Sequence, residues 1–153
     1  MTTPIIEHIA ANVATTIDGI TTGAGYNQTL TARRPPRNDF KDTPPTNGLV
    51  LIKQSDTGRE PDPTMSTAWK ETFNLYAYVI ESDSVTTSID IKNNQVRSDI
   101  EKAILVDVTR GGYAHETEIA DIAEFVDDEG FSGIAVIIEV KYRTVYGDPY
   151  TKG

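Results

Sequence analysis

Two long stretches of alternating residues constrain the fold of this chain most. In residues 67–81, TAWKETFNLYAYVIE, the odd-numbered side chains from Trp69 to Val79 share one face and the even-numbered ones share the other, because successive side chains of a strand point to opposite sides. Both faces become apolar towards the end of this stretch, so we expect that end to be covered on both sides. Residues 131–145, FSGIAVIIEVKYRTV, alternate similarly. We therefore expect two long strands.

Residues 4–20 predict a helix. Their apolar residues recur at steps of three and four and form one stripe: Ile5, Ile6, Ile9, Val13, Ile17 and Ile20. The Thr3 hydroxyl is expected to cap this helix, with Pro4 at its first position and Gly23 and Gly25 beyond its end.

Residues 82–107 predict a second helix, capped by Asp83 or Ser84 and ended by the TRGG sequence. Its apolar residues keep helical spacing: Val85, Ile89, Val96, Ile100 and Ile104.

The remaining segments are shorter or irregular. Residues 48–54 and 116–126 predict strands, residues 127–130 a tight turn, and YNQTLTAR at 26–33 allows one further short strand. We expect an extended arm at 26–47, which contains four prolines, a polar loop at 55–66 and an exposed tail at 146–153. Together these elements predict one α+β domain over residues 1–153, with a mainly antiparallel sheet and two helices packed on one face.

Composition narrows the class of protein. The chain has 153 residues, no cysteine and a formal net charge of −9, which excludes a disulfide framework and thiolate chemistry. Its N-terminus lacks the features of a secretory signal, and no apolar run is long enough for a membrane span, so we expect a soluble protein without a membrane partner. The acidic balance also argues against broad coating of nucleic acid.

Catalytic patterns are weak. Asp56-Thr57-Gly58 matches the triplet of aspartic proteases, but it lacks the preceding apolar strand and is better interpreted as a turn. His8 and His115 are the two histidines, and structural or solvated roles suit both better than a triad or a metal site.

Two further patterns also lack the spacing of a binding site. The carboxylates of DDEG at 127–130 lack the spacing of a calcium loop, and TRGGY at 109–113 lacks the lysine and following helix of a phosphate-binding loop. We expect no enzymatic activity, no metal and no cofactor.

A basic run interrupts the acidic chain. Arg33, Arg34 and Arg37 lie within five positions around two prolines, in TARRPPRNDF. It could be a solvated loop, a weak ligand for a proline-recognising module, or an arm that docks on an acidic neighbour. Arginine suits the last role, because its planar fork bonds carboxylates and phosphates through two parallel hydrogen bonds.

Three segments together resemble a known family. They are SDIEKAILVDVTRGGYAHETEI, GFSGIAVIIEVKYRTVYGDPYT, and the N-terminal helix followed by the RRPPR loop. They are similar to the tail-terminator and tail-completion proteins of long-tailed bacteriophages, the class that includes the lambda tail terminator. The likeness covers residues 4–151, and YRTVYGDPY is its most characteristic part.

The resemblance implies a structural role in the virion. It implies a ring, usually a hexamer, at the head-proximal end of the tail tube, which ends polymerisation of the major tail tube protein and joins the head-tail connector. DNA would pass through the lumen without specific binding. The protein would belong to the virion, after assembly in the host cytoplasm. Under this reading, we expect Arg33, Arg34, Arg37, Asp148 and Tyr150 at subunit interfaces.

The sequence also allows other functions. A neighbouring neck protein, a head-tail connector or a minor tail protein is the nearest alternative. Two further alternatives are a DNA-contacting module that uses the RRPPR run and a small hydrolase or metal enzyme that uses His8 or His115.

Overall fold

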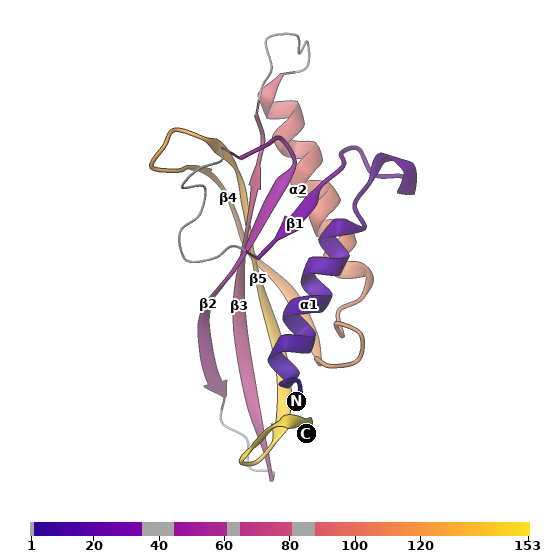
Figure 1. The fold of residues 1–153 in the computed structure, drawn as a ribbon, viewed down its shortest axis with the longest axis vertical. Helices are drawn as coiled ribbons and strands as arrows, with labels where there is room; N and C mark the ends of the chain where they lie inside the picture. Colours follow the sequence, from indigo (N-terminus) through magenta and orange to yellow (C-terminus); the bar gives the residue numbers. More distant parts are fainter. Residues whose placement is uncertain (1, 35–44, 61–64, 81–87) are drawn as a thin grey trace.

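A computed structural model describes residues 2–34, 45–60, 65–80 and 88–153. The molecule is elongated, and the long strands run along its longest axis (Figure 1). The elements are α1 (Ile5–Asp18), the short 3-10 helix η1 (Thr22–Ala24), β1 (Thr31–Arg33), β2 (Leu49–Glu60), β3 (Ser66–Tyr78), α2 (Ile89–Val106), β4 (Glu116–Val126), β5 (Ser132–Val145) and β6 (Asp148–Lys152).

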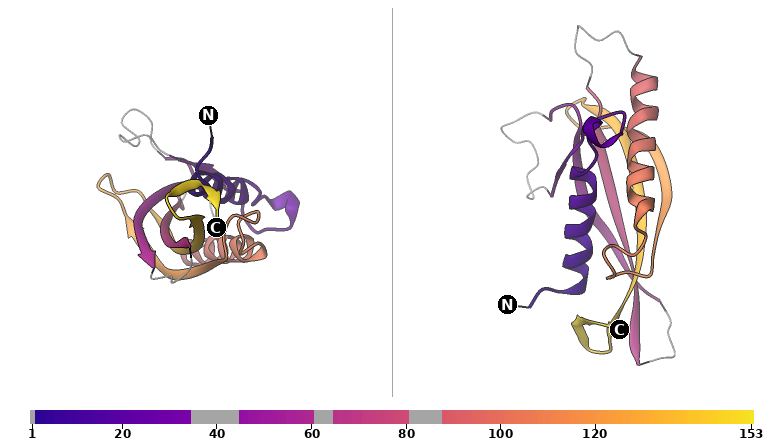
Figure 2. Two further views of the ribbon diagram at one scale, coloured as in Figure 1. Left: turned by 90° about the horizontal axis from the view of Figure 1, so that it is seen from below. Right: turned by 90° about the vertical axis from the view of Figure 1, so that its right-hand side faces the viewer.

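The strands form one curled sheet. Its order is β1-β2-β3-β5-β4, with β6 paired to β5 beyond this path. The β1–β2 pair is parallel, and every other pairing in the described sheet is antiparallel. Both helices lie side by side on one side of the sheet (Figure 2). The expected α+β fold with a mainly antiparallel sheet is therefore confirmed.

One hydrophobic core lies between the helices and the sheet. The two long strands line the core on the sheet side, where Phe73 of β3 is paired with Ile138 of β5. Ile9 and Val13 of α1 and Ile100 of α2 close it from the helix side, and all five of these side chains are fully buried. The helical stripe and the strand alternation seen in the sequence are the two surfaces of this core.

The ends of both helices differ from expectation. Helix α1 begins at Ile5 with Pro4 as its N-cap and without a side-chain cap. The Pro4 carbonyl accepts the N–H groups of Glu7 and His8 at 3.0 and 3.2 Å, so the predicted Thr3 cap was wrong. Helix α2 begins at Ile89, where the Ser88 hydroxyl accepts the N–H of Asp90 at 3.3 Å.

The expected start of the second helix, with Asp83, Ser84 and Val85, lies outside the described residues. At the other end of α2, Arg110 adopts a positive φ of 50°. Its buried guanidinium donates to the carbonyls of Ile104 and Asp107. A cation there satisfies carbonyls that the helix leaves unpaired and faces the negative end of the helix dipole.

The predicted polar loop at 55–66 was wrong over most of its described part. Strand β2 continues to Glu60, and Thr57 pairs with Glu71 of β3. A register shift between Gln54 and Asp56 takes up one residue as a bulge. Asp56-Thr57-Gly58 is therefore part of a strand rather than a turn, and residues 61–64 lie outside the described part.

Short strands lie within the predicted arm and the predicted tail. Within the arm at 26–47, the N–H of Leu30 donates to Ile20 at 2.9 Å and β1 pairs with β2, whereas residues 35–44 lie outside the description. The tail at 146–153 has exposed side chains, but it forms β6 and folds back on β5. Gly147 makes this turn with a φ of +76°, a conformation that glycine adopts without strain.

Candidate protein-contact surfaces

The two histidines lie in different parts of the fold. His8 of α1 stacks on Tyr113, with ring centroids 4.3 Å apart and planes 4° from parallel. His115 precedes β4, and its backbone N–H donates to Lys141 at 2.8 Å. Within residues 2–34, 45–60, 65–80 and 88–153, no three His, Cys, Asp or Glu side chains are grouped to hold a metal ion.

Polar side chains of neighbouring strands surround the buried carboxylate of Glu71. Its carboxylate, only 2% exposed, accepts from Gln54 at 3.3 Å and from the Thr57 hydroxyl. Burial, and secondarily the charge of Glu71, raises the pKa of Tyr142 to about 12. The cluster joins β2, β3 and β5 and acts as internal structure. Sequence reasoning missed it because its members meet only through strand pairing.

Arg34 of the basic run is bound to helix α1 of the same chain. The guanidinium of Arg34 binds Glu7 of α1 through two hydrogen bonds of 2.5 and 2.9 Å. This bonding lowers the pKa of Glu7 and raises that of Arg34. Arg33 ends β1, and Arg37 lies outside the described residues. That these arginines contact a neighbouring subunit stays a prediction.

Asp148, the second interface candidate, shapes the turn into β6. Its carboxylate accepts from the Thr151 hydroxyl at 2.6 Å and from the N–H of Tyr150 at 3.0 Å. The bond from Thr151, followed by that from Tyr150, lowers the pKa of Asp148. This carboxylate therefore orients Tyr150, whose side chain is exposed.

Apolar side chains gather around this turn. Met65 lies beside Tyr146, whose N–H donates to the Met65 carbonyl at 3.1 Å. Met65 and Tyr146 are 90% and 70% exposed, and Val145 and Tyr150 of the β5–β6 hairpin are also exposed. We call these four residues the hairpin tip. It lies at the end of the molecule where both chain termini lie (Figure 1). Sequence reasoning singled out Tyr150 but missed Met65 and Tyr146.

The edge strand β4 carries a row of acidic side chains. Glu116, Glu118, Asp121 and Glu124 are all exposed, and β4 pairs with β5 at the end of the strand order. The opposite end of that order is β1, which carries Arg33. The two edges of the sheet therefore carry side chains of opposite charge.

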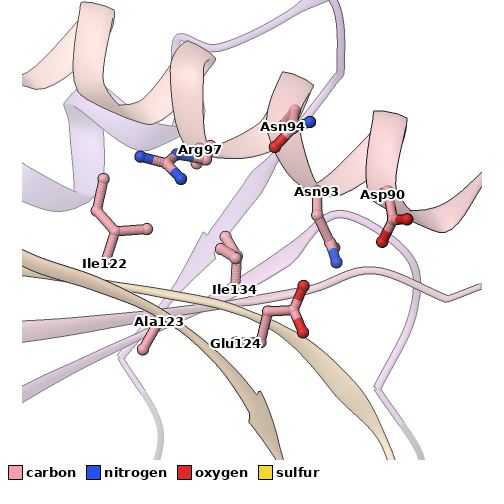
Figure 3. A pocket seen from close by; sticks show the side chains of 8 residues that line it. All are labelled: Asp90, Asn93, Asn94, Arg97, Ile122, Ala123, Glu124 and Ile134. Carbon is pink, nitrogen blue, oxygen red and sulfur yellow. The ribbon is translucent and has the colours of Figure 1, made fainter.

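A polar pocket of about 320 Å³ lies between α2 and β4 (Figure 3). Asn93 reaches from the helix towards the strand, the carboxylates of Asp90 and Glu124 lie on either side of it, and Arg97 is at the far end. A second cavity of about 290 Å³ shares Asp90, Asn93 and Glu124 and continues along β4 towards Val126. Asn93 is 8% exposed, and its Oδ1 has no hydrogen-bond partner among the described residues.

Comparison with known proteins gives no identification. The chain matches no family model, and no curated protein matches it. None of the helices in the described part of the chain combines the length and apolarity needed to cross a membrane.

Proposed function

We propose that this chain is a structural protein of a long-tailed phage virion. It forms a ring at the head-proximal end of the tail tube, ends tube polymerisation and offers the surface that joins the head. This proposal adopts the role implied by the resemblance of YRTVYGDPY and the flanking segments to tail terminators. The role is structural rather than enzymatic, and DNA passes through the acidic ring without specific binding.

The hairpin tip is the observation that carries the proposal. Four apolar side chains, two of them tyrosines, stand exposed at one end of an acidic molecule. Tyrosine is enriched at protein contacts, so exposed tyrosines at one end of the molecule suit a contact with another protein. The most characteristic part of the resemblance, YRTVYGDPY, contains three of the four tip residues. We assign the tip to docking on the tube protein.

The sheet edges support a ring rather than a two-fold dimer. The acidic edge at β4 differs in charge from the edge at β1. Copies that meet through two different surfaces form a heterologous contact, which closes into a ring when the rotation between neighbours allows it.

The mass of the protein in solution tests the ring. Sedimentation over a wide range of concentrations, together with negative-stain images, is expected to show a closed species of six times the 16.8 kDa chain mass. A dimer as the largest species would contradict the proposal, because it indicates a self-complementary contact. A monomer that also fails to bind tail tubes would contradict it too.

A further inference from the structure

We propose that neighbouring copies of this chain join by strand pairing. The open edge of β2, over residues 54–60, pairs with the start of β4, residues 116–119, of the next copy. The inference rests on the proposed ring, for which it names the contact between subunits. It commits to a second copy of this chain as the partner of both edges.

Both stretches have a backbone edge that the chain itself leaves open. Among the described residues, the backbone of 54–60 bonds only to β3, and the backbone of 116–119 bonds only to β5. The N–H and C=O groups on the other side of each strand have no backbone partner there. Unpaired strand edges of this kind are templates for pairing with a strand of another chain.

The two open stretches lie level with each other across the sheet. Residues that face each other on successive strands form rows, of which two are Asp56–Thr72–Glu139–Glu118 and Gly58–Lys70–Lys141–Glu116. Each row begins at the open edge of β2 and ends at the open edge of β4. A copy rotated about an axis parallel to the strands therefore brings its end of a row beside the start of the same row.

Strand direction fits the same rotation. The pairs β2–β3, β3–β5 and β5–β4 are all antiparallel, so β2 and β4 run in opposite directions. The long strands follow the longest axis of the molecule (Figure 1), and rotation about that axis keeps their direction. The incoming β4 is therefore antiparallel to β2, and the sheet continues from copy to copy. This is the heterologous contact that a ring needs.

The contact is limited to the start of β4. The row that contains Glu124 crosses the sheet to Val50 and ends on Ala32 of β1, which covers the edge of β2 at that level. The register shift between Ile119 and Asp121 marks a bulge, and a bulge bends its strand. Residues beyond the bulge therefore lie outside the proposed contact.

Charge restrains the pairing. The rows place Asp56 beside Glu118 of the next copy, and both carboxylates are exposed. Like charges directly opposite each other weaken a strand pair, and charged side chains on a free edge limit unwanted pairing. Neutralising Glu118 should therefore strengthen the contact, whereas neutralising a carboxylate outside it should not.

Cysteine cross-linking tests the pairing. The chain has no cysteine, so introduced thiols react without background. Opposite residues of paired strands have Cβ atoms about 5 Å apart, close to the Cβ separation of a disulfide. Oxidation of a mixture of Asp56→Cys and Glu118→Cys proteins should give a linked dimer that contains one copy of each.

Glu124→Cys is the matched control. Glu124 is exposed on the same strand, but its row ends at β1, so it should not link to Asp56→Cys. Equal yield with Glu124→Cys would overturn the inference. A dominant link between two Asp56→Cys chains would also overturn it, because β2 would then pair with itself.

Sedimentation of charge variants gives a second readout. Glu118→Gln should raise the association constant between copies about threefold, as expected for removal of one opposed like-charge pair. Glu124→Gln should leave it unchanged. Weaker association of Glu118→Gln than of wild type would contradict the inference.

The strand pairing and the proposed function can fail separately. A hexamer that binds tail tubes but gives no link between positions 56 and 118 overturns the pairing and leaves the function standing. That link in a protein that never joins tail tubes supports the pairing and overturns the function. A protein that stays monomeric at every concentration and gives no link overturns the pairing.

Discussion

Asp99 of α2 accepts a hydrogen bond from the backbone N–H of Gln28 at 2.8 Å. The same carboxylate also accepts the backbone N–H and the side-chain amide of Asn27 at 3.2 and 3.3 Å. Asp99 is 4% exposed. It therefore fastens the segment between α1 and β1 to the second helix, and it positions the start of the basic run.

Replacing Asp99 should destabilise the protein. Asp99→Ala leaves three donors without their acceptor, and we expect the free energy of unfolding to fall by about 2–4 kcal/mol. Urea denaturation followed by circular dichroism measures it. Glu101→Ala, an exposed change on the same helix, is the control, with an expected effect within about 0.5 kcal/mol. Equal effects of the two variants would contradict the assigned role.

The Arg34–Glu7 pair should contribute little to the free energy of unfolding, and only above acidic pH. Both partners are partly exposed, so Glu7→Gln should cost less than about 1 kcal/mol at neutral pH. The pKa of Glu7 is lowered from 4.5 in the folded state. The contribution is therefore present above about pH 4.5 and is lost as the pH falls through the folded value.

Stability of wild type and Glu7→Gln, measured from pH 7 downwards, checks this pair. The two curves should converge in acid. A gap that persists well below pH 4 would show that the glutamine disturbs something other than the ion pair.

Tyr142 should ionise at a higher pH than an ordinary tyrosine. Burial raises its pKa to about 12, above the ordinary value near 10. The raised pKa means that the contribution of the neutral Tyr142 hydroxyl to stability is present below pH 10. It is lost as the pH rises through the pKa of the folded state. Ultraviolet titration of the wild type should show a tyrosine transition near pH 12, and Tyr142→Phe should lack it. An unchanged high-pH transition would refute the assignment.

The hairpin tip should matter for assembly and not for folding. Tyr146→Ser changes an exposed side chain, so we expect the free energy of unfolding to change by less than about 0.5 kcal/mol. Binding to tail tubes, measured by co-sedimentation, should fall at least tenfold, as for a central interface tyrosine. Val106→Ser, an equally exposed change at the end of α2, should bind normally.

Sequence patterns predicted the elements whose signal is local. The stripe from Ile5 to Ile17 and the alternation around Phe73 arise from helical and strand periods, so they were readable without tertiary information. The structure confirms α1, β3, β4 and β5 close to their expected bounds.

Features that depend on distant partners were missed. Asp56-Thr57-Gly58 has turn-forming residues, yet pairing with β3 and the bond from Thr57 to Glu71 hold it as a strand. The burial of Asn93, whose Oδ1 has no partner among the described residues, follows only from the packing of α2 over β4. A polar residue on a helix gives no sign of burial until its neighbour in space is known.

Immunogold labelling of virions tests the central claim most directly. An antibody against this chain, applied to particles purified from a culture that produces it, should label the junction between head and tail. Label on the capsid, label at the distal tail end, or its absence from purified particles would contradict the proposed role.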